Sequence, residues 1–224
     1  MDLEVLAEIQ KKILGHLKDI PELEAFYLTG GTALSKFYLS HRKSDDLDFF
    51  TPIEELLQPI SLKIEAALIK TGADVERKRG FRSFVELNVS VPSESTIIHL
   101  ALDSPFRLDP TIVADEFPGL RIDSLRDLAA NKLLALFGRA TLRDFVDVFF
   151  LAKEKFAKND LILMANKKDP GFDLYWLGTA FERIHEFSAD SSEMLLLVKP
   201  CSMESLAAFF DGWRKEIFLE ITKK

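Results

Sequence analysis

The sequence predicts an α+β protein, with a mixed sheet flanked by helices in residues 1–122 and a helical half in residues 123–224. Apolar residues recur at helical spacing near the N-terminus, then alternate with a period of two between residues 73 and 102. Helical spacing returns after residue 123. This change of period places the expected domain boundary near residue 122.

The first half contains the signals for both helices and strands. A short apolar strand runs directly into Gly30 and Gly31, and Gly72 is placed to stop a long helix that begins near Pro52. The expected elements are a helix at 3–18, a strand at 25–28, a helix at 32–39, a strand at 46–50, a helix at 52–70, a hairpin of 73–79 and 81–89 around Gly80, and a strand at 95–102.

From Asp123 onward the strand signal fades and helices dominate. The break at Asp169-Pro-Gly and the break at Lys199-Pro200 separate its later segments. The expected helices are two that meet near residues 138–141, one at 172–187 and a final amphipathic helix at 203–221.

Composition limits the classes of protein that the chain can represent. It has 224 residues, 47% of them apolar, and a net charge of −7, which argues against a general nucleic-acid coat protein. The single Cys201 excludes an internal disulfide framework. No export signal and no run of about 18 apolar residues is seen, so we expect a cytoplasmic protein without a membrane partner.

The segment Asp45-Asp46-Leu47-Asp48 places two carboxylates on one face of a strand. Side chains alternate along a strand, so Asp46 and Asp48 point the same way and Leu47 points the other way. Two such anions repel each other, and a divalent cation such as Mg²⁺ removes the conflict while leaving sites for phosphate oxygens. A solvent-facing acidic turn neutralised by Arg42 or Lys43 is the alternative.

Gly30, Gly31 and Thr32 stand at the start of a predicted helix. A helix N-terminus offers unpaired N–H groups, and glycines there let a phosphate approach the backbone closely. A tight turn with Thr32 as N-cap requires no ligand and is the alternative. The pattern is neither a Walker loop nor a dinucleotide-binding fingerprint.

A spaced set of motifs resembles the DNA polymerase β-like nucleotidyltransferases, and more closely their AbiEii/AbiGii-type toxin branch. The resemblance covers roughly residues 20–155. It rests on Gly30-Gly31-Thr32-Ala33-Leu34, His41-Arg42-x-Ser44-x-Asp46-Leu47-Asp48-Phe49, Asn131-Lys132, and Arg139 followed by Arg143-Asp144-x-x-Asp147.

The resemblance implies a polymerase β-like fold and an active site that uses a nucleoside triphosphate (NTP) with Mg²⁺ or Mn²⁺. It implies metal binding by Asp46 and Asp48, and catalytic positions that also include Lys132, Asp144 and Asp147. The nucleotide-binding positions that it implies are Gly30, Gly31, Thr32, Arg42, Ser44, Lys132 and Arg139. It further implies an RNA acceptor such as a tRNA 3′ end, and a toxin–antitoxin or phage-defence setting with a cognate antitoxin protein.

The helical half adds a geometrical argument of its own. Lys132 and Arg139 are about two turns apart at about 3.6 residues per turn, so they share a helix face. Asp144 and Asp147 are neighbours on the next helix. An Arg143–Asp147 surface ion pair is the alternative use of Asp147.

A third metal-binding carboxylate is in question. His99, Ala101 and Asp103 share one strand face, and Ala101 stands at the apparent third-carboxylate position. Asp103 either substitutes for it as a metal ligand or caps the turn before Pro105. His16, His99 and His185 lack partners at metal-ligand spacing.

Two functional questions stay open on sequence alone. The run Arg77-Lys78-Arg79-Gly80-Phe81-Arg82 is either a grip for an RNA backbone or a solvated turn. The leading hypothesis is an NTP-dependent nucleotidyltransferase that releases pyrophosphate. The alternatives are a catalytically weakened nucleotide-binding regulatory module, and an enzyme that modifies protein or a small molecule such as an aminoglycoside.

Overall fold

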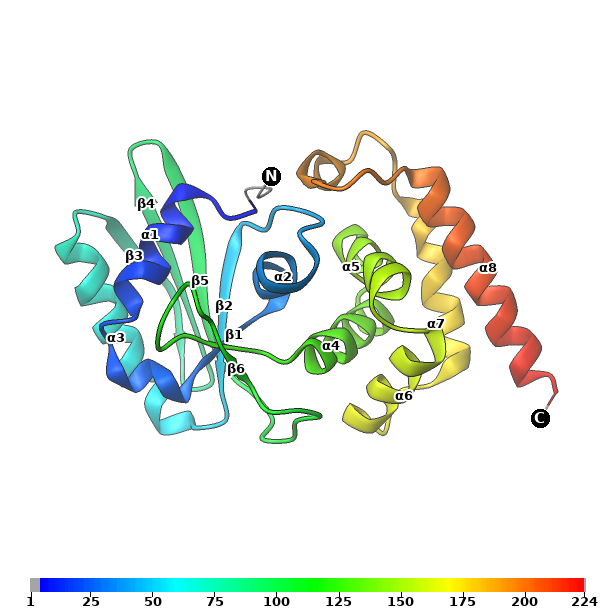
Figure 1. Cartoon of the computed structure of the whole chain (residues 1–224), viewed down its shortest axis with the longest axis horizontal. Coiled ribbons are helices and arrows are strands. Elements are labelled where there is room, and N and C mark those ends of the chain that lie inside the picture. The colour runs from blue at the N-terminus through cyan, green and yellow to red at the C-terminus, as the bar shows by residue number, and fades with distance from the viewer. Residues whose placement is uncertain (1–4, 224) are drawn as a thin grey trace. The chain divides into compact units, whose positions relative to one another are not determined.

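The computed structural model describes residues 5–223, and these residues form two compact units. The first unit runs through Tyr38 and resumes from Lys43 to Ser124. The second unit takes Leu39–Arg42 and the chain from Leu125 onward. Figure 1 follows the chain by colour through both units. Within residues 5–223, none of the helices is both long enough and apolar enough to cross a membrane.

The first unit is built on a seven-stranded mixed sheet with the order β3-β4-β5-β2-β1-β7-β6. Strand β2 pairs antiparallel with β1 and parallel with β5, and β3, β4 and β5 form an antiparallel meander. The strands are β1 (Tyr27–Thr29), β2 (Asp46–Thr51), β3 (Asp74–Phe81), β4 (Phe84–Val91), β5 (Glu94–Leu102), β6 (Ile112–Val113) and β7 (Arg121–Ile122).

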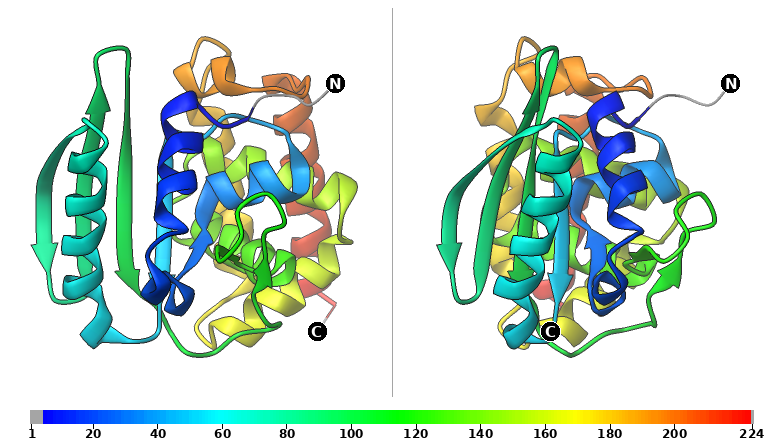
Figure 2. Two further views of the ribbon diagram at one scale, coloured as in Figure 1. Left: turned by 60° about the vertical axis from the view of Figure 1, so that its left-hand side comes forward. Right: turned by 90° about the vertical axis from the view of Figure 1, so that its left-hand side faces the viewer.

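Helices α1 and α3 cover one face of this sheet (Figure 2). Beneath them, Leu47 and Phe49 of β2 and Leu87 of β4 are completely buried. Each such side chain contributes about 1.5–3 kcal/mol through burial. The first unit's helical segments are α1 (Glu8–Leu17), η1 (Pro21–Ala25), α2 (Gly30–Leu34), the π-helical η2 (Ser35–Leu39, whose last residue joins the second unit) and α3 (Glu54–Lys70).

The second unit is helical. Phe145, Phe181, Phe210 and Trp213 are buried together in its core, with edge-on ring contacts such as Phe145–Phe210 at 4.8 Å between centroids. Its elements are α4 (Leu125–Gly138), α5 (Leu142–Glu154), α6 (Lys158–Lys168), α7 (Leu174–Phe181), η3 (Glu182–Glu186), η4 (Ser192–Leu196) and α8 (Met203–Ile221).

Most of the expected elements are present, with local differences. Helix α8 has the predicted bounds, whereas the helix expected at 3–18 is observed as Glu8–Leu17, and residues 3 and 4 lie outside the described residues. The segment 172–187 is α7 followed by the tighter η3 rather than one helix. Helix α6 and the two-residue strands β6 and β7 were not expected, because their apolar patterns are too short or too weak to show a period.

The hairpin does not turn at Gly80. Phe81 pairs with Phe84, so the turn is made by the two residues between them, and Gly80 stays in β3 opposite Val85. A shift of register between Arg77 and Arg79 absorbs the extra residue. Gly80 therefore lies in a strand with an irregular register, and the chain reverses two residues later.

Candidate functional site

The acidic strand β2 presents its two predicted carboxylates on one face. Asp46 and Asp48 are half-buried, while Leu47 between them is fully buried on the opposite face. This confirms the alternation expected from the sequence. Asp48 lies opposite Thr29 of β1 on one side and opposite His99 of β5 on the other.

The glycine turn is in direct contact with this carboxylate pair. Gly30 has φ +71°, a left-handed conformation that a side chain disfavours. A Cβ at Gly30 would overlap with the Asp48 carboxylate, and its nearest atom there would be Oδ2. The Thr32 hydroxyl donates a hydrogen bond to the backbone oxygen of Asp46. Gly30 therefore brings the start of α2 against the acidic strand because it lacks a side chain.

The donor set fits a divalent cation held together with a phosphate-bearing ligand. No group of three or more His, Cys, Asp or Glu side chains suited to a metal ion occurs within residues 5–223. Magnesium in sites for nucleotides is commonly held by only one or two carboxylates, with phosphate oxygens and water completing its shell. Asp46 and Asp48 on one strand face, beside a turn free of side chains, provide that number of protein ligands.

His99 is a member of this site that the sequence did not reveal. Its Nδ1 lies 2.9 Å from Asp48 Oδ1, and its Nε2 lies 3.9 Å from Glu86 Oε2. The hydrogen bond to Asp48 raises the pKa of His99 above its ordinary value, although partial burial opposes that shift. Spacing along the chain indicated no metal-ligand partner for His99, and it did not reveal this contact with a carboxylate from another strand. His185 likewise contacts a remote carboxylate, Asp211, at 3.0 Å.

The strand register bears on the question of a third carboxylate. Ala101 lies opposite Phe50, and the residue opposite Asp48 is His99. Asp103 lies beyond the end of β5, where the Tyr27 hydroxyl donates a hydrogen bond to its Oδ2 and its own N–H donates to Thr51. The sequence pattern put Ala101 at the apparent third-carboxylate position, because the register of two parallel strands cannot be read from local alternation.

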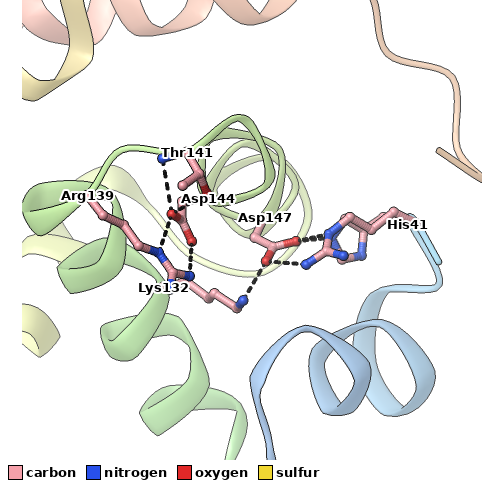
Figure 3. Close-up of polar contacts among 7 residues, drawn as sticks. His41, Lys132, Arg139, Thr141, Asp144 and Asp147 are labelled. Carbon is pink, nitrogen blue, oxygen red and sulfur yellow. Dashed lines mark hydrogen bonds and ion pairs between the residues drawn. The ribbon is translucent and has the colours of Figure 1, made fainter. Parts of the chain in front are cut away.

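In the second unit, a fully buried carboxylate lies among three nitrogen-bearing side chains (Figure 3). Asp147 accepts a hydrogen bond from Arg42 Nη2 at 2.9 Å and forms an ion pair with Lys132 at 2.7 Å. His41 Nε2 lies 2.7 Å from the same carboxylate. Asp147 is thus not part of a surface pair with Arg143. It joins the segment Leu39–Arg42 to helices α4 and α5.

The charges of this cluster follow from burial and pairing. Burial alone would raise the pKa of Asp147, but Arg42 and Lys132 outweigh it and hold that pKa well below its usual range. Burial lowers the pKa of His41, with the hydrogen bond to Asp147 acting in the opposite direction. His41 Nδ1 is buried without a hydrogen-bond partner within residues 5–223. A neutral imidazole that donates from Nε2 fits these contacts.

Asp144 makes contacts at the start of α5. Its carboxylate receives Arg139 Nε and Nη2, each at 2.9 Å, and the Thr141 hydroxyl at 2.6 Å (Figure 3). Burial acts to raise the pKa of Asp144, but the Arg139 and Thr141 hydrogen bonds bring it below its ordinary value. Lys132 of α4 and Arg139, the residue after the end of α4, both pair with aspartates of α5.

The predicted site residues therefore form two groups, one in each unit. In the first unit, Ser44 is buried and its backbone oxygen accepts a 2.8 Å hydrogen bond from Gln10. The first group contains Gly30, Gly31, Thr32, Asp46 and Asp48, and the second contains Arg42, Lys132, Arg139, Asp144 and Asp147. Sequence reasoning missed the role of His41 beside Asp147, although it quoted His41 within the motif.

The basic run on β3 and its turn carries acidic partners of its own. Arg77 is turned toward α3, where it contacts Ser61 and Glu65. Side chains of Lys78, Arg79 and Arg82 remain 46%, 62% and 83% exposed. The ion pairs are Arg77–Glu65, Lys78–Glu76, Arg79–Glu86 and Arg82–Glu54. Local charge is therefore balanced, although exposed pairs of this kind are weak and can exchange for other ions.

Comparison with solved structures shows the same fold in several proteins, two of them described as nucleotidyltransferases. JHP933 from Helicobacter pylori is 21% identical, with 96% of this chain and 91% of that chain covered and a TM-score of 0.57. A putative nucleotidyltransferase from H. pylori is also 21% identical, with 97% of this chain and 98% of that chain covered and a TM-score of 0.58. MenT4, a nucleotidyltransferase toxin from Mycobacterium tuberculosis H37Rv, is 19% identical, with 93% of this chain and 80% of that chain covered and a TM-score of 0.59.

The search of curated proteins found no match. The family model described as the nucleotidyl transferase AbiEii toxin of type IV toxin–antitoxin systems matches residues 12–195, most of the chain. The architecture is the expected α+β fold, a mixed sheet flanked by helices and followed by a helical half, and MenT4 shares it. The chain belongs to the AbiEii toxin family and is a nucleotidyltransferase enzyme.

Proposed function

We propose that this toxin transfers a nucleoside monophosphate from an NTP to a hydroxyl at the 3′ end of an RNA, such as a tRNA. The contact between Gly30 and Asp48 carries the proposal, because it places a turn suited to phosphates against carboxylates suited to a cation. In the reaction, the acceptor oxygen forms a bond to the α-phosphorus. The bond to the β-phosphate oxygen breaks, and pyrophosphate leaves.

The residues of the first unit would bind and orient the nucleotide. Backbone N–H groups at Gly30 and Gly31 would approach the phosphates, with Thr32 fixing the turn to the strand. Asp46 and Asp48 would hold Mg²⁺, or Mn²⁺. Such an ion, when bound, offsets the negative charge of the triphosphate. Because the reaction needs NTP and RNA, we place it in the cytoplasm, with an antitoxin protein as the partner that restrains it.

By the same proposal, the helical unit contributes Lys132. Its ammonium would offset the negative charge that develops on the leaving pyrophosphate. Asp147 would hold the lysine side chain in place, since the two are 2.7 Å apart and both are buried. Arg42 and Arg139 would support this cluster through the two buried aspartates of α5.

One experiment tests the proposed reaction directly. The purified protein is incubated with Mg²⁺, total RNA or total cell protein, and each of the four NTPs labelled in turn at the α-phosphate. Labelled RNA with matching pyrophosphate release is the expected result. Label in the protein fraction would identify a protein acceptor instead. Nucleotide binding without pyrophosphate release from any mixture would contradict transfer and favour the regulatory-module alternative, which the histidine opposite Asp48 motivates.

A further inference from the structure

A line of polar residues crosses the sheet of the first unit through Asp48. In the strand register, Asp48 of β2 lies opposite His99 of β5, His99 lies opposite Glu86 of β4, and Glu86 lies opposite Arg79 of β3. Residues in register on neighbouring strands present their side chains on the same face. The line therefore runs along the face that carries the two carboxylates, from the glycine turn toward the edge strand β3.

The contacts along this line fix the His99 ring. Its Nδ1 lies 2.9 Å from Asp48 Oδ1, and its face packs against Phe84 with 5.4 Å between ring centroids. Its Nε2 faces Glu86 Oε2 at 3.9 Å, beyond hydrogen-bond distance but close enough for the two charges to interact. Glu86 in turn lies 3.6 Å from Arg79. The ring is thus held from two strands while its Nδ1 side is committed to Asp48.

The two oxygens of Asp48 have different surroundings. Oδ1 contacts His99, whereas Oδ2 is the atom nearest to the position that a Gly30 side chain would occupy. A carboxylate on a strand can rotate about its side-chain bonds, and a hydrogen bond to one oxygen fixes which oxygen faces the neighbouring turn. The hydrogen bond from the His99 imidazole to Oδ1 therefore leaves Oδ2 as the Asp48 oxygen that faces the glycine turn.

We propose that His99 is a positioning residue of the cation site, in which its Nδ1–H holds Asp48 Oδ1 and keeps Oδ2 directed at the Gly30 turn. The inference rests on the proposed function, because Asp48 is taken there as a metal ligand. His99 supports that ligand and is not itself one, since its Nδ1 is occupied by Asp48 and its Nε2 faces Glu86. Groups that orient metal ligands in this way commonly govern metal affinity.

The test is a titration of the purified protein with Mn²⁺, followed by electron paramagnetic resonance of the free ion, without NTP and without turnover. His99→Ala should weaken Mn²⁺ binding about ten- to a hundredfold. His99→Asn should retain most of the affinity, because its amide can donate from near the Nδ1 position. His99→Gln places its amide near the Nε2 position, away from Asp48, and should bind as weakly as the alanine variant.

His185→Ala is the matched control, because it removes a His–Asp contact of similar length from the surface of the other unit. It should bind Mn²⁺ like the wild type. Equal affinity of His99→Ala and the wild type would overturn the inference and leave the proposed function standing. Absence of Mn²⁺ binding by the wild type would reject the metal assignment itself. Should His99→Ala fail to fold, tighter binding by the glutamine variant than by the asparagine variant would overturn the inference.

Discussion

Gly30 and Asp48 constrain each other at the level of single atoms. The carboxylate occupies the space that any side chain at Gly30 would need, and the backbone at Gly30 has a positive φ. Replacing Gly30 thus imposes two separate penalties, backbone strain and displacement of Asp48. A second glycine with positive φ allows the two penalties to be separated, since Gly72 has φ +88° and open space around it.

We expect Gly30→Ala and Gly72→Ala each to lose about 1–2 kcal/mol of unfolding free energy from left-handed strain. Only Gly30→Ala should also lose nucleotidyl transfer, because its methyl group displaces the Asp48 carboxylate. Urea denaturation and the labelled-NTP assay measure the two effects. Equal transfer by the two variants would show that the contact between turn and carboxylate is not needed for the reaction.

The carboxylates themselves give the second prediction at this scale. Asp46→Asn and Asp48→Asn should each reduce transfer to background while the fold is kept. Asp46→Asn should also keep or raise the melting temperature, because removing one of two crowded anions relieves repulsion. Asp45→Asn is the matched control, since this neighbouring side chain precedes the strand and is exposed. Full transfer by either of the first two variants would remove Asp46 or Asp48 from the proposed mechanism.

Helix α5 shows how a single element can depend on charges from distant parts of the chain. Asp147 is fully buried, and its partners come from α4 and from the segment Leu39–Arg42. Removing one partner from a buried ion cluster commonly costs about 3–5 kcal/mol because a charge is left uncompensated. The protonation states of Asp147 and its partners therefore affect the packing of α5 against the rest of its unit, in addition to its apolar contacts.

His41 gives this element a dependence on pH. Its pKa is lowered in the folded protein, so the unfolded chain takes up the proton first as pH falls through about 6.5. The part of the unfolding free energy that depends on neutral His41 should therefore be fully present above that pH. Below it, this part should fall by at most about 1.4 kcal/mol per pH unit. Asp147 acts in a separate pH range. Its lowered pKa also stabilises the folded protein, and that stabilisation is lost only in stronger acid.

The test compares thermal unfolding of the wild type and His41→Gln at pH 7.5 and pH 5. Glutamine can donate to Asp147 from the Nε2 position but does not titrate, so the variant should lose less stability over this interval. Exposed His185→Gln serves as the control and should follow the wild type. Parallel losses in all three proteins would assign the acid sensitivity to another group.

The edge strand β3 is the second element with a testable charge pattern. If the exposed cations of β3 and of the turn after it contact an RNA backbone, replacing Lys78, Arg79 and Arg82 by Gln should weaken RNA binding. For single-stranded RNA, the slope of log affinity against log salt should fall by about 2. Fluorescence anisotropy at several salt concentrations measures both, and nucleotide binding should not change. Arg77 is left intact because it contacts Ser61 of α3.

The control for β3 removes the same number of cations elsewhere in the first unit. Lys12, Lys18 and Lys63 are exposed, and their replacement by Gln changes net charge equally. An unchanged salt slope in the β3 variant, or the same change in the control, would favour the solvated-turn interpretation of the basic run.

For the molecule as a whole, the proposal requires a residue of the helical unit in a reaction whose nucleotide is held by the sheet unit. Lys132 is buried and paired with Asp147, so its replacement affects stability as well as activity. Lys168 is a matched reference, because its ammonium forms a 2.8 Å pair with the fully buried Asp127 in the same unit. Methionine at either position retains the apolar stem and removes the charge.

We expect Lys132→Met and Lys168→Met to lower the melting temperature to a similar extent. Transfer measured well below both melting temperatures should fall about a hundredfold or more in Lys132→Met alone, because a contact to the developing charge is lost. Equal transfer by the two variants would leave Lys132 with a structural role only, and the proposed chemistry would then rest on the first unit.

How far the sequence predicts the site depends on the distance along the chain over which each contact forms. The face shared by Asp46 and Asp48 follows from the period of two, and the glycine turn follows from residues next to one another. His99 contacts Asp48 across 51 positions through a parallel pairing of strands whose register local periodicity does not contain. A surface pair of Asp147 with Arg143 stayed open as an alternative, because its partners on Leu39–Arg42 lie 105 and 106 positions away.

The segment Leu39–Arg42 also has a consequence for synthesis of the protein. It belongs to the helical unit although the chain of the sheet unit surrounds it in sequence. On the ribosome, Arg42 is made 105 residues before Asp147, the carboxylate against which it is buried. During that interval the cation must stay hydrated, because burying it alone is too costly. The core of the helical unit is therefore completed late, and a fragment that begins after Ser124 would lack both the arginine that pairs with Asp147 and the histidine that hydrogen-bonds to it.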